Sequence, residues 1–189
     1  MAISTYTELK TAIANFLARD DLTSVIPDFI QLAEATMSRE LETRSQEKRA
    51  TATLTSGDEY IALPTDLREV REVKLNTTPL TVLTSYSTVA LDSNFSSGGV
   101  GKPKGFSIIG DEMKMRPVPD DSYTAEIIYI GSITALSDSN ATNNILTRSP
   151  DAYLYGSLAE AYAYLLDEQR ASQYLQRFNL ALEQIKVDE

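Results

Sequence analysis

The glycine-rich stretch SNFSSGGVGKPKG holds the first residues that could do chemistry, because glycines beside lysines can cradle phosphate groups. Its spacing argues against a Walker-type loop, since that motif needs a glycine where Ser96 stands and a serine or threonine where Pro103 stands. The motif also needs a following helix, whereas the next residues have the composition of a strand. We therefore expect a flexible loop, or a loop that a partner orders. The candidate interface residues in it are Gly98, Gly99, Lys102 and Lys104.

A second loop, SDSNATNNILTRS, resembles a calcium loop because oxygen-bearing side chains alternate along it. The central glycine of such a loop is replaced by Asn143, and its terminal glutamate by Ser149. We therefore interpret this loop as a polar connector that caps the helix after it. The alternating residues are Asp138, Asn140, Thr142 and Asn144.

Adjacent carboxylates occur at Asp20–Asp21 and Asp120–Asp121, and such pairs could do acid–base work if burial shifted their pKa values. Both pairs stand in turn-like sequence, where acids are usually solvated. The chain has no cysteine and no histidine, which excludes thiolate nucleophiles, thiolate or imidazole zinc sites and Ser-His-Asp triads. We assign no catalytic, cofactor-binding or metal-binding residue and expect no enzyme.

Tyrosines and arginines gather near the C-terminal end, with five of the ten tyrosines between Tyr153 and Tyr174. The first four of them cannot all face one core, because they lie on different sides of a single helix. They either close the rim of a helical bundle or belong to a protein interface, where tyrosine and arginine are enriched. The candidate interface residues are Tyr153, Tyr155, Tyr162, Tyr164, Arg170 and Arg177.

Two helices joined by a short turn are expected between Pro150 and Ile185, and they would carry these side chains. Apolar residues recur there at steps of three and four. Ser149 can cap the first helix, Pro150 suits its first position and Asp151 complements the helix dipole. A pair with such wide apolar faces is not stable alone and needs a cover.

The N-terminal region predicts two further helices that could supply this cover. Thr5 and Glu8 have the spacing of a capping box at the start of a helix from about Thr5 to Ala18. A second, longer helix opens at Pro27, and its apolar stripe is Ile26, Ile30, Ala33, Met37 and Leu41. We expect the two pairs to close a four-helix bundle.

Between the helix pairs the hydrophobic period changes to short runs of Thr, Val, Ile and Tyr, which is strand composition. We expect a small antiparallel sheet, a sandwich or partial barrel, inserted between helices two and three. Gly110-Asp111 is a hairpin signal. The expected strands are Ala50–Leu54, Tyr60–Leu63, Val70–Leu75, Phe106–Ile109, Glu112–Arg116 and Tyr123–Ile130, with an edge strand at Leu80–Leu83 and a short helix at Tyr86–Asp92.

The fold class is therefore α+β, and 189 residues suit a single domain. Its helical bundle would comprise residues 1–49 and 150–189, and its β-rich insertion residues 50–149. The formal net charge is −10, so we expect no broad surface that binds DNA phosphates. No run approaches the ~18 apolar residues of a membrane span, and the N-terminal residues lack a signal sequence. We expect no membrane contact and a protein made and used inside a cell.

The order of these features resembles the head-to-tail adaptor (connector) proteins of tailed bacteriophages, the group that includes the tail tubular protein A of short-tailed phages. Four stretches in succession carry the resemblance: IPDFIQLAEATMSREL, YIALPTDLREVREVKL, GKPKGFSIIGDEMKMRPVPDDSYTAEIIYI and NILTRSPDAYLYGSLAEAYAYLLDE. Together they cover most of the chain. Each is a structural pattern, and none is a catalytic signature.

The resemblance implies a structural virion protein in the neck, assembled in the host cytoplasm. Its copies would form a dodecameric ring beneath the portal protein, extend the DNA channel and dock the tail or nozzle. DNA would pass through the lumen without specific binding, and an acidic lumen would suit this passage. Only four residues follow Ile185, so portal contact through this end is expected to be short or made elsewhere.

Two other classes remain as hypotheses. One is an acidic cellular protein-binding module without catalytic activity. The other is an enzyme that uses carboxylates alone, which would require two or more buried acids converging in a pocket.

Overall fold

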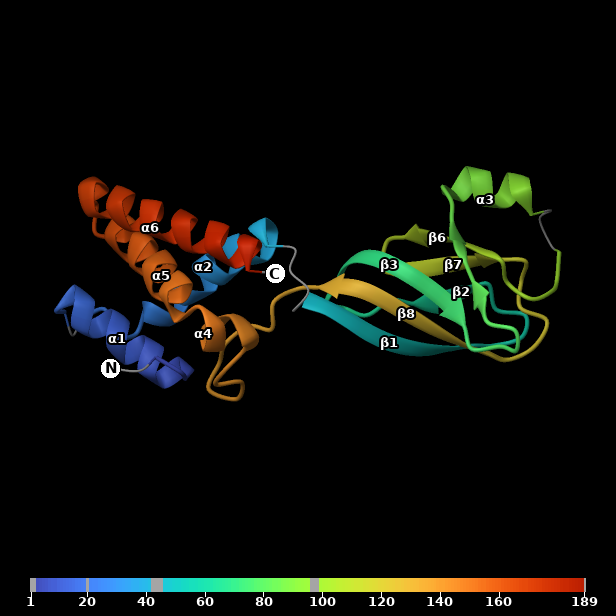
Figure 1. Cartoon of the computed structure of the whole chain (residues 1–189), viewed down its shortest axis with the longest axis horizontal. Helices are drawn as coiled ribbons and strands as arrows, with labels where there is room; N and C mark the ends of the chain where they lie inside the picture. Colours follow the sequence, from blue (N-terminus) through green and yellow to red (C-terminus); the bar gives the residue numbers. More distant parts are fainter. Residues whose placement is uncertain (1–2, 20, 42–45, 96–98, 189) are drawn as a thin grey trace. The chain divides into compact units, whose positions relative to one another are not determined.

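The computed structural model describes residues 3–19, 21–41, 46–95 and 99–188. These residues form a mixed α+β structure with six helices and two sheets, and the chain divides into two compact units (Figure 1). The helical unit comprises Met1–Ser45 and Ile133–Glu189, and the β unit comprises Gln46–Ser132. The α+β class is as expected from the sequence. That both units form one domain stays a prediction.

The N-terminal helices have the expected positions. Helix α1 is Tyr6–Leu17, and Thr5 and Glu8 form the predicted capping box, with the Glu8 amide donating to Thr5 Oγ1. Helix α2 is Ile26–Glu40 and has Pro27 in its first turn. Both helices bury one stripe, which ends in Leu17 in α1 and Met37 in α2.

Helix α5, Pro150–Tyr164, packs against α6, Glu168–Val187, and also against α2 and α1 (Figure 1). Because neighbours lie on several sides of it, buried residues occur around its whole circumference. They are Ala152, Tyr153, Leu154, Gly156, Ser157, Leu158, Ala159, Ala161 and Tyr162. Helix α6 has a single buried stripe that ends at Ile185. The helix pair predicted between Pro150 and Ile185 is confirmed.

The segment from 133 to 149, which the sequence assigned to the insertion, packs with the helices. It contains a short helix, α4, Asn144–Arg148, whose first turn is capped by the side chain of Asn143. Leu136 and Leu146 join the core of the helical unit. Ser149 occupies the N-cap position of α5 as expected, but its side chain makes no capping hydrogen bond, so this part of the prediction was wrong. Pro150, which has no amide hydrogen, begins the helix there.

The β unit consists of two four-stranded sheets, which the expected small sheet allowed for in its form as a sandwich. The first has the order β1–β8–β3–β4, and the second the order β2–β7–β6–β5. Side chains from both sheets form one apolar core that includes Val73, Ile127 and Met115. The strands are β1 Glu47–Leu54, β2 Tyr60–Ala62, β3 Leu67–Leu75, β4 Thr81–Val82, β5 Thr84–Ser85, β6 Gly105–Ile109, β7 Glu112–Arg116 and β8 Tyr123–Gly131.

The predicted strands are all present, with ends shifted by up to three residues. The hairpin turn at Gly110-Asp111 joins β6 to β7, with Gly110 at a positive φ of 60°. The short helix is α3, Thr88–Asn94. Strand β5 had no sequence signal, and it pairs parallel with β6, so the antiparallel prediction does not hold for this pair.

Candidate functional site

The predicted interface residues of α5 and α6 form one row of side chains in the structure. Tyr155 and Tyr162 are seven positions apart, so they share a face of α5, and Arg170 and Arg177 share a face of α6 in the same way. The two helices run antiparallel from the turn around Leu166. Arg170 is as far from Leu166 in sequence as Tyr162 is, and Arg177 as far as Tyr155, so the hairpin register brings each arginine opposite a tyrosine.

The rings and guanidinium groups lie at contact distances. Tyr162 and Tyr174 are stacked, with ring centroids 5.4 Å apart and planes 6° from parallel. The guanidinium carbon of Arg170 is 5.4 Å from the Tyr162 centroid. That of Arg177 is 5.7 Å from the Tyr155 centroid and 5.6 Å from the Tyr174 centroid. We call the row Arg170, Tyr162, Tyr174, Arg177 and Tyr155 the arginine–tyrosine ladder.

The ladder is partly exposed. Tyr162 is buried, Tyr155 and Tyr174 are half-buried, and both arginines are exposed. Each aromatic pair adds about 0.5–1.5 kcal/mol beyond the area that it buries, and each exposed arginine–ring contact about 0.5–1 kcal/mol. Tyr174 was missing from the predicted interface set, although its spacing from Arg170 and Arg177 puts it on their face. The row therefore fixes the arginine side chains over rings at the surface of the helical unit.

Tyr164 lies outside the ladder. Its side chain is 61% exposed, and its ring is 5.5 Å from that of Phe29, centroid to centroid. Leu166, in the turn that follows, is 88% exposed and has a positive φ of 58°. Tyr164 thus remains available for a contact, at the end of the α5–α6 hairpin.

Tyr153 is a different case, because its side chain is completely buried. Its hydroxyl donates a hydrogen bond of 2.9 Å to Glu34 Oε1 and accepts one of 2.6 Å from Asn143 Nδ2. Glu34 Oε1 also accepts the amide of Leu136 at 2.8 Å. A side chain enclosed in this way has no surface to offer a partner. The structure therefore corrects the assignment of Tyr153 to an interface.

Burial determines the electrostatics of this network. It raises the pKa of the Glu34 carboxyl, although the hydrogen bonds from Leu136 and Tyr153 oppose that shift. Burial likewise raises the pKa of Tyr153, and the nearby Glu34 charge raises it further. Tyr153 is therefore a neutral donor at physiological pH. The network connects α2, α5 and the 133–149 segment, which is a structural role.

The described residues of the glycine-rich loop do not have the context of a phosphate loop. Gly98 lies outside the described residues. Gly99 is half-buried, and its carbonyl accepts the Val118 amide at 2.9 Å. Lys102 is half-buried and Lys104 exposed, and the strand β6 follows them where a phosphate loop would need a helix.

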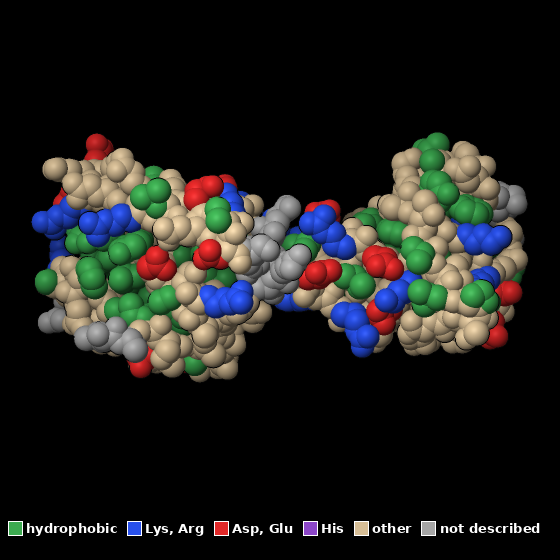
Figure 2. Space-filling view, viewed as in Figure 1, with side chains coloured by type: hydrophobic (Ala, Val, Ile, Leu, Met, Phe, Trp, Pro, Cys, Tyr) green, Lys and Arg blue, Asp and Glu red, His purple; other side chains and the backbone are tan. Residues whose placement is uncertain are grey.

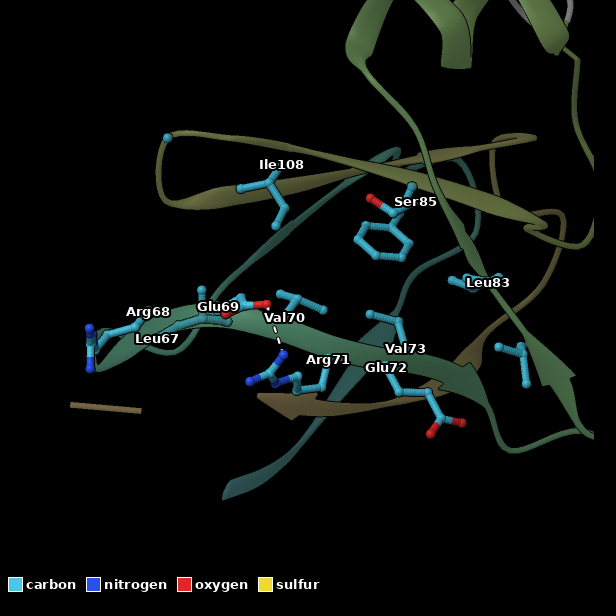
Figure 3. A pocket seen from close by; sticks show the side chains of 13 residues that line it. Leu67, Arg68, Glu69, Val70, Arg71, Glu72, Val73, Leu83, Ser85 and Ile108 are labelled. Atoms are coloured by element: carbon cyan, nitrogen blue, oxygen red, sulfur yellow. Dashed lines mark hydrogen bonds and ion pairs between the residues drawn. The ribbon is translucent and has the colours of Figure 1, made fainter. Parts of the chain in front are cut away.

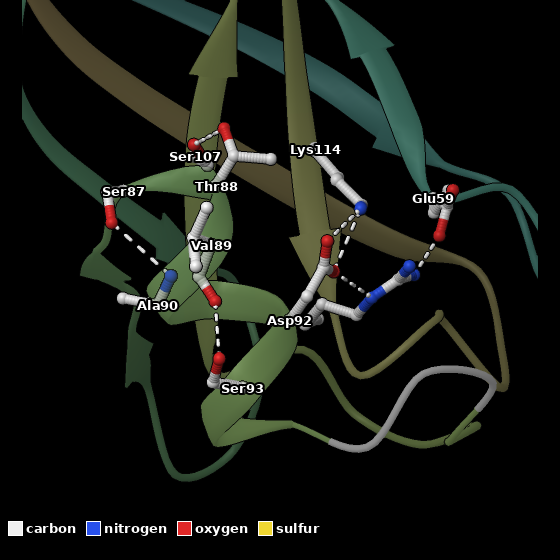
Figure 4. Close-up of polar contacts among 10 residues, drawn as sticks. Glu59, Ser87, Thr88, Val89, Ala90, Asp92, Ser93, Ser107 and Lys114 are labelled. Carbon is white, nitrogen blue, oxygen red and sulfur yellow. Dashed lines mark hydrogen bonds and ion pairs between the residues drawn. The ribbon is translucent and has the colours of Figure 1, made fainter.

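Two buried cations of β7 contact Asp92 of α3 in the β unit, and Figure 4 shows one of them, Lys114. Lys114 Nζ donates to both carboxylate oxygens of Asp92 at 2.8 Å, and Arg116 Nε donates to Asp92 Oδ1 at 3.2 Å. Arg116 also pairs with Glu59. The side chains of Lys114 and Arg116 are 9% and 7% exposed, so these carboxylates satisfy charges that are out of water. The cluster holds α3 on the second sheet.

A groove with a volume of about 490 Å³ lies between β3 and the second sheet (Figure 3). Of its acids, Glu69 is exposed and pairs with Arg71 at 3.1 Å, and Glu72 is half-buried. A carboxylate enzyme would need buried acids converging here, and these acids do not meet that requirement. Among the described strands, none pairs with the outer edge of β3 between Leu67 and Glu72. Charged side chains along such an edge discourage pairing with another chain.

The other acidic candidates are solvated or paired. Asp20 lies outside the described residues, and Asp21 pairs with Arg19 at 2.6 Å. Asp120 and Asp121 are exposed. In the calcium-like loop, Asp138 pairs with Lys10 at 2.9 Å. In the described ranges, no three acidic side chains are placed to hold a metal ion.

Comparison with known proteins gives a family match. The family model of the SU10 adaptor protein matches residues 4–189. No curated protein matches the chain. No helix in the described part of the chain has the length and apolar character needed to cross a membrane. The match includes both units and agrees with the resemblance to phage head-to-tail adaptors in the sequence. The chain therefore belongs to the SU10 adaptor protein family, a family of structural phage adaptors of the virion neck.

Proposed function

We propose that this protein is a head-to-tail adaptor whose copies form a dodecameric ring below the portal. The ring extends the DNA channel and gives the tail or nozzle a docking surface. The observation that carries this proposal is the family match over residues 4–189, which includes the helical and the β unit together. In this proposal α1, α2, α5 and α6 act as a four-helix bundle that forms the body of the ring.

The contacts with other copies, the portal and the tail are also part of the proposal. They include Tyr155, Tyr162, Tyr164, Arg170, Arg177, Gly98, Gly99, Lys102 and Lys104. Tyr153 is left out, because it is buried inside the helical unit. The net charge of −10 supports a conduit that releases DNA, since acidic walls repel the phosphate backbone. A ring with a basic lumen would contradict this part of the proposal.

The decisive experiment is binding to the portal. Purified adaptor is mixed with portal rings of the same phage, and the complex is weighed by native mass spectrometry. We expect a single complex with one adaptor for each portal subunit. A portal that stays at its own mass, or takes up a variable number of adaptors, would refute the proposal. An acidic cellular binding module would leave the portal unchanged.

A further inference from the structure

The arginine–tyrosine ladder holds two guanidinium groups with their faces occupied and their edges open. Arg177 lies over the rings of Tyr155 and Tyr174, and among the described residues it has no ion pair with a carboxylate. Arg170 lies over Tyr162 and is 62% exposed, and its one ion pair within the described part of the chain is a 3.5 Å contact from Nε to Asp167 Oδ2. The N–H groups at both edges can therefore donate hydrogen bonds to a further partner.

The chemistry of that partner follows from the guanidinium fork. A planar fork binds a carboxylate or a phosphate through two parallel hydrogen bonds, and its planarity distinguishes it from the point charge of lysine. Because the rings already restrict the arginine side chains, less conformational entropy is lost when the partner binds. The ladder is thus a preorganised receptor for an oxyanion.

The net charge of the chain indicates that the oxyanion is a protein carboxylate and not a DNA phosphate. The chain has 27 acidic and 17 basic residues, so its copies repel DNA and expose many carboxylates to one another. An example of such exposed carboxylates is the group Asp58, Asp120 and Asp121. They lie on two turns that are joined by the hydrogen bond from the Gly57 amide to the Pro119 carbonyl. Within the described ranges none of the three has an ion pair with lysine or arginine.

A ring also requires a contact of this type. Copies related by rotation in a ring meet through two different surfaces, so a basic patch on one copy must find its complement elsewhere on the next. Figure 2 shows lysine and arginine side chains beside hydrophobic ones on the visible face of the helical unit. We propose that the ladder of one copy binds exposed carboxylates of a second copy, and this inference rests on the proposed ring.

The test places a photo-crosslinking phenylalanine analogue at position 173 of the full chain. Gln173 is exposed and lies between Arg170 and Arg177 on their face of α6, so no ladder residue is lost. Crosslinking is done with the protein alone at raised concentration and with the protein assembled on the portal. We expect adaptor–adaptor crosslinks whose second peptide contains exposed Asp or Glu residues.

Three substitutions sharpen this test. Arg177→Gln removes the charge, and Arg177→Lys keeps the charge but loses the fork. Arg39→Gln is the matched control, because Arg39 is an exposed arginine of α2 in the same unit. We expect both Arg177 variants to weaken copy–copy association about tenfold or more, with the control unchanged. Circular dichroism checks that each variant is folded.

The outcomes separate the inference from the proposed function. Crosslinks only to portal or DNA, or adaptor–adaptor crosslinks that survive Arg177→Gln, overturn the inference even when the portal complex forms normally. A sequence-independent gain of crosslinks to added DNA would assign the ladder to phosphates and overturn it too. If the wild type fails to bind portal, the proposed function fails, and crosslinking of the protein alone still decides the inference.

Discussion

The hydroxyl of Tyr153 donates a hydrogen bond of 2.9 Å to Glu34 Oε1, which joins α5 to α2 inside the helical unit. Glu34 is 7% exposed, so its carboxylate depends on this bond and on the Leu136 amide to replace water. The hydrogen bond between Tyr153 and Glu34 lies inside the helical unit. Tyr153 is therefore absent from the surface, although the sequence made it an interface candidate.

The substitution Tyr153→Phe tests this dependence. It keeps the ring but removes the hydrogen bond to the buried Glu34 carboxylate and the one from Asn143, so we expect the free energy of unfolding to fall by about 1–3 kcal/mol. Urea unfolding followed by circular dichroism measures the change. The control is Tyr123→Phe, which removes an exposed hydroxyl bonded to Asp120 at 2.7 Å and should have a smaller effect. Equal losses in both variants would argue against a special role of burial.

The raised pKa of Glu34 predicts a pH dependence of stability. In the unfolded chain a glutamate has a pKa of about 4.3. In the folded state burial raises the pKa of Glu34 above this value. Between the two values the folded state binds the extra proton, so this group makes the protein more stable as the pH falls through that window. At higher pH the charged form is less favourable in the fold.

The comparison with Glu34→Gln isolates the pH-dependent contribution of Glu34 to stability, because glutamine does not titrate. Unfolding free energies are measured for both proteins from neutral to acidic pH. We expect the wild type to gain stability relative to the variant as the pH falls below the folded pKa. A difference that is independent of pH, or one of the opposite sign, would show that Glu34 is not shifted upward.

The glycine at position 156 allows three helices to approach closely. A Cβ at this position would lie 2.9 Å from Phe178 Cε2 in α6 and 3.0 Å from Ala33 Cβ in α2. We expect Gly156→Ala to destabilise the protein by about 1–3 kcal/mol despite the better helix propensity of alanine. Thermal unfolding of the wild type and the variant measures this loss of stability.

The neighbouring substitution Ser157→Ala serves as a control of opposite sign. Ser157 Oγ is buried, and within the described structure it has no hydrogen-bond partner. Removing it should raise the free energy of unfolding by up to about 1 kcal/mol, since a buried unsatisfied hydroxyl is unfavourable. Destabilisation by both changes would mean that α5 tolerates no substitution here, whatever its chemistry.

The Asp92 cluster predicts a local effect in the β unit. Asp92→Asn removes a charge that Lys114 and Arg116 share, leaving Arg116 with Glu59 and Lys114 with no carboxylate among the described residues. We expect the free energy of unfolding to fall by about 1–3 kcal/mol. The change should lie toward the lower end of this range, because the Asp92 side chain is 37% exposed. Hydrogen exchange should show faster exchange in α3.

Ser93→Ala is the control for this change. Ser93 is exposed in the same helix, and its hydroxyl donates to the Val89 carbonyl at 2.7 Å (Figure 4). Its exchange pattern should match the wild type. Unchanged protection of α3 in Asp92→Asn would show that apolar packing, not the ion pairs, holds the helix.

The sequence was sufficient for the elements whose signals are local. The capping box of Thr5 and Glu8, the Gly110-Asp111 turn and Pro150 at a helix start each act within a few residues of the chain. Hydrophobic spacing and strand composition placed the long helices and seven of the strands. Strand β5 and helix α4 were missed, because elements of two and five residues show no period.

Only the tertiary structure decided which side chains of α5 and α6 act together. Tyr153 and Tyr155 differ by two positions, which turns them about 200° apart on the helix, and spacing cannot say which direction is covered. Neighbours from α2 and the 133–149 segment bury Tyr153, while the α6 hairpin register sets Arg177 over Tyr155. Burial and stacking depend on residues distant in sequence, so the ladder becomes visible only after the chain has folded.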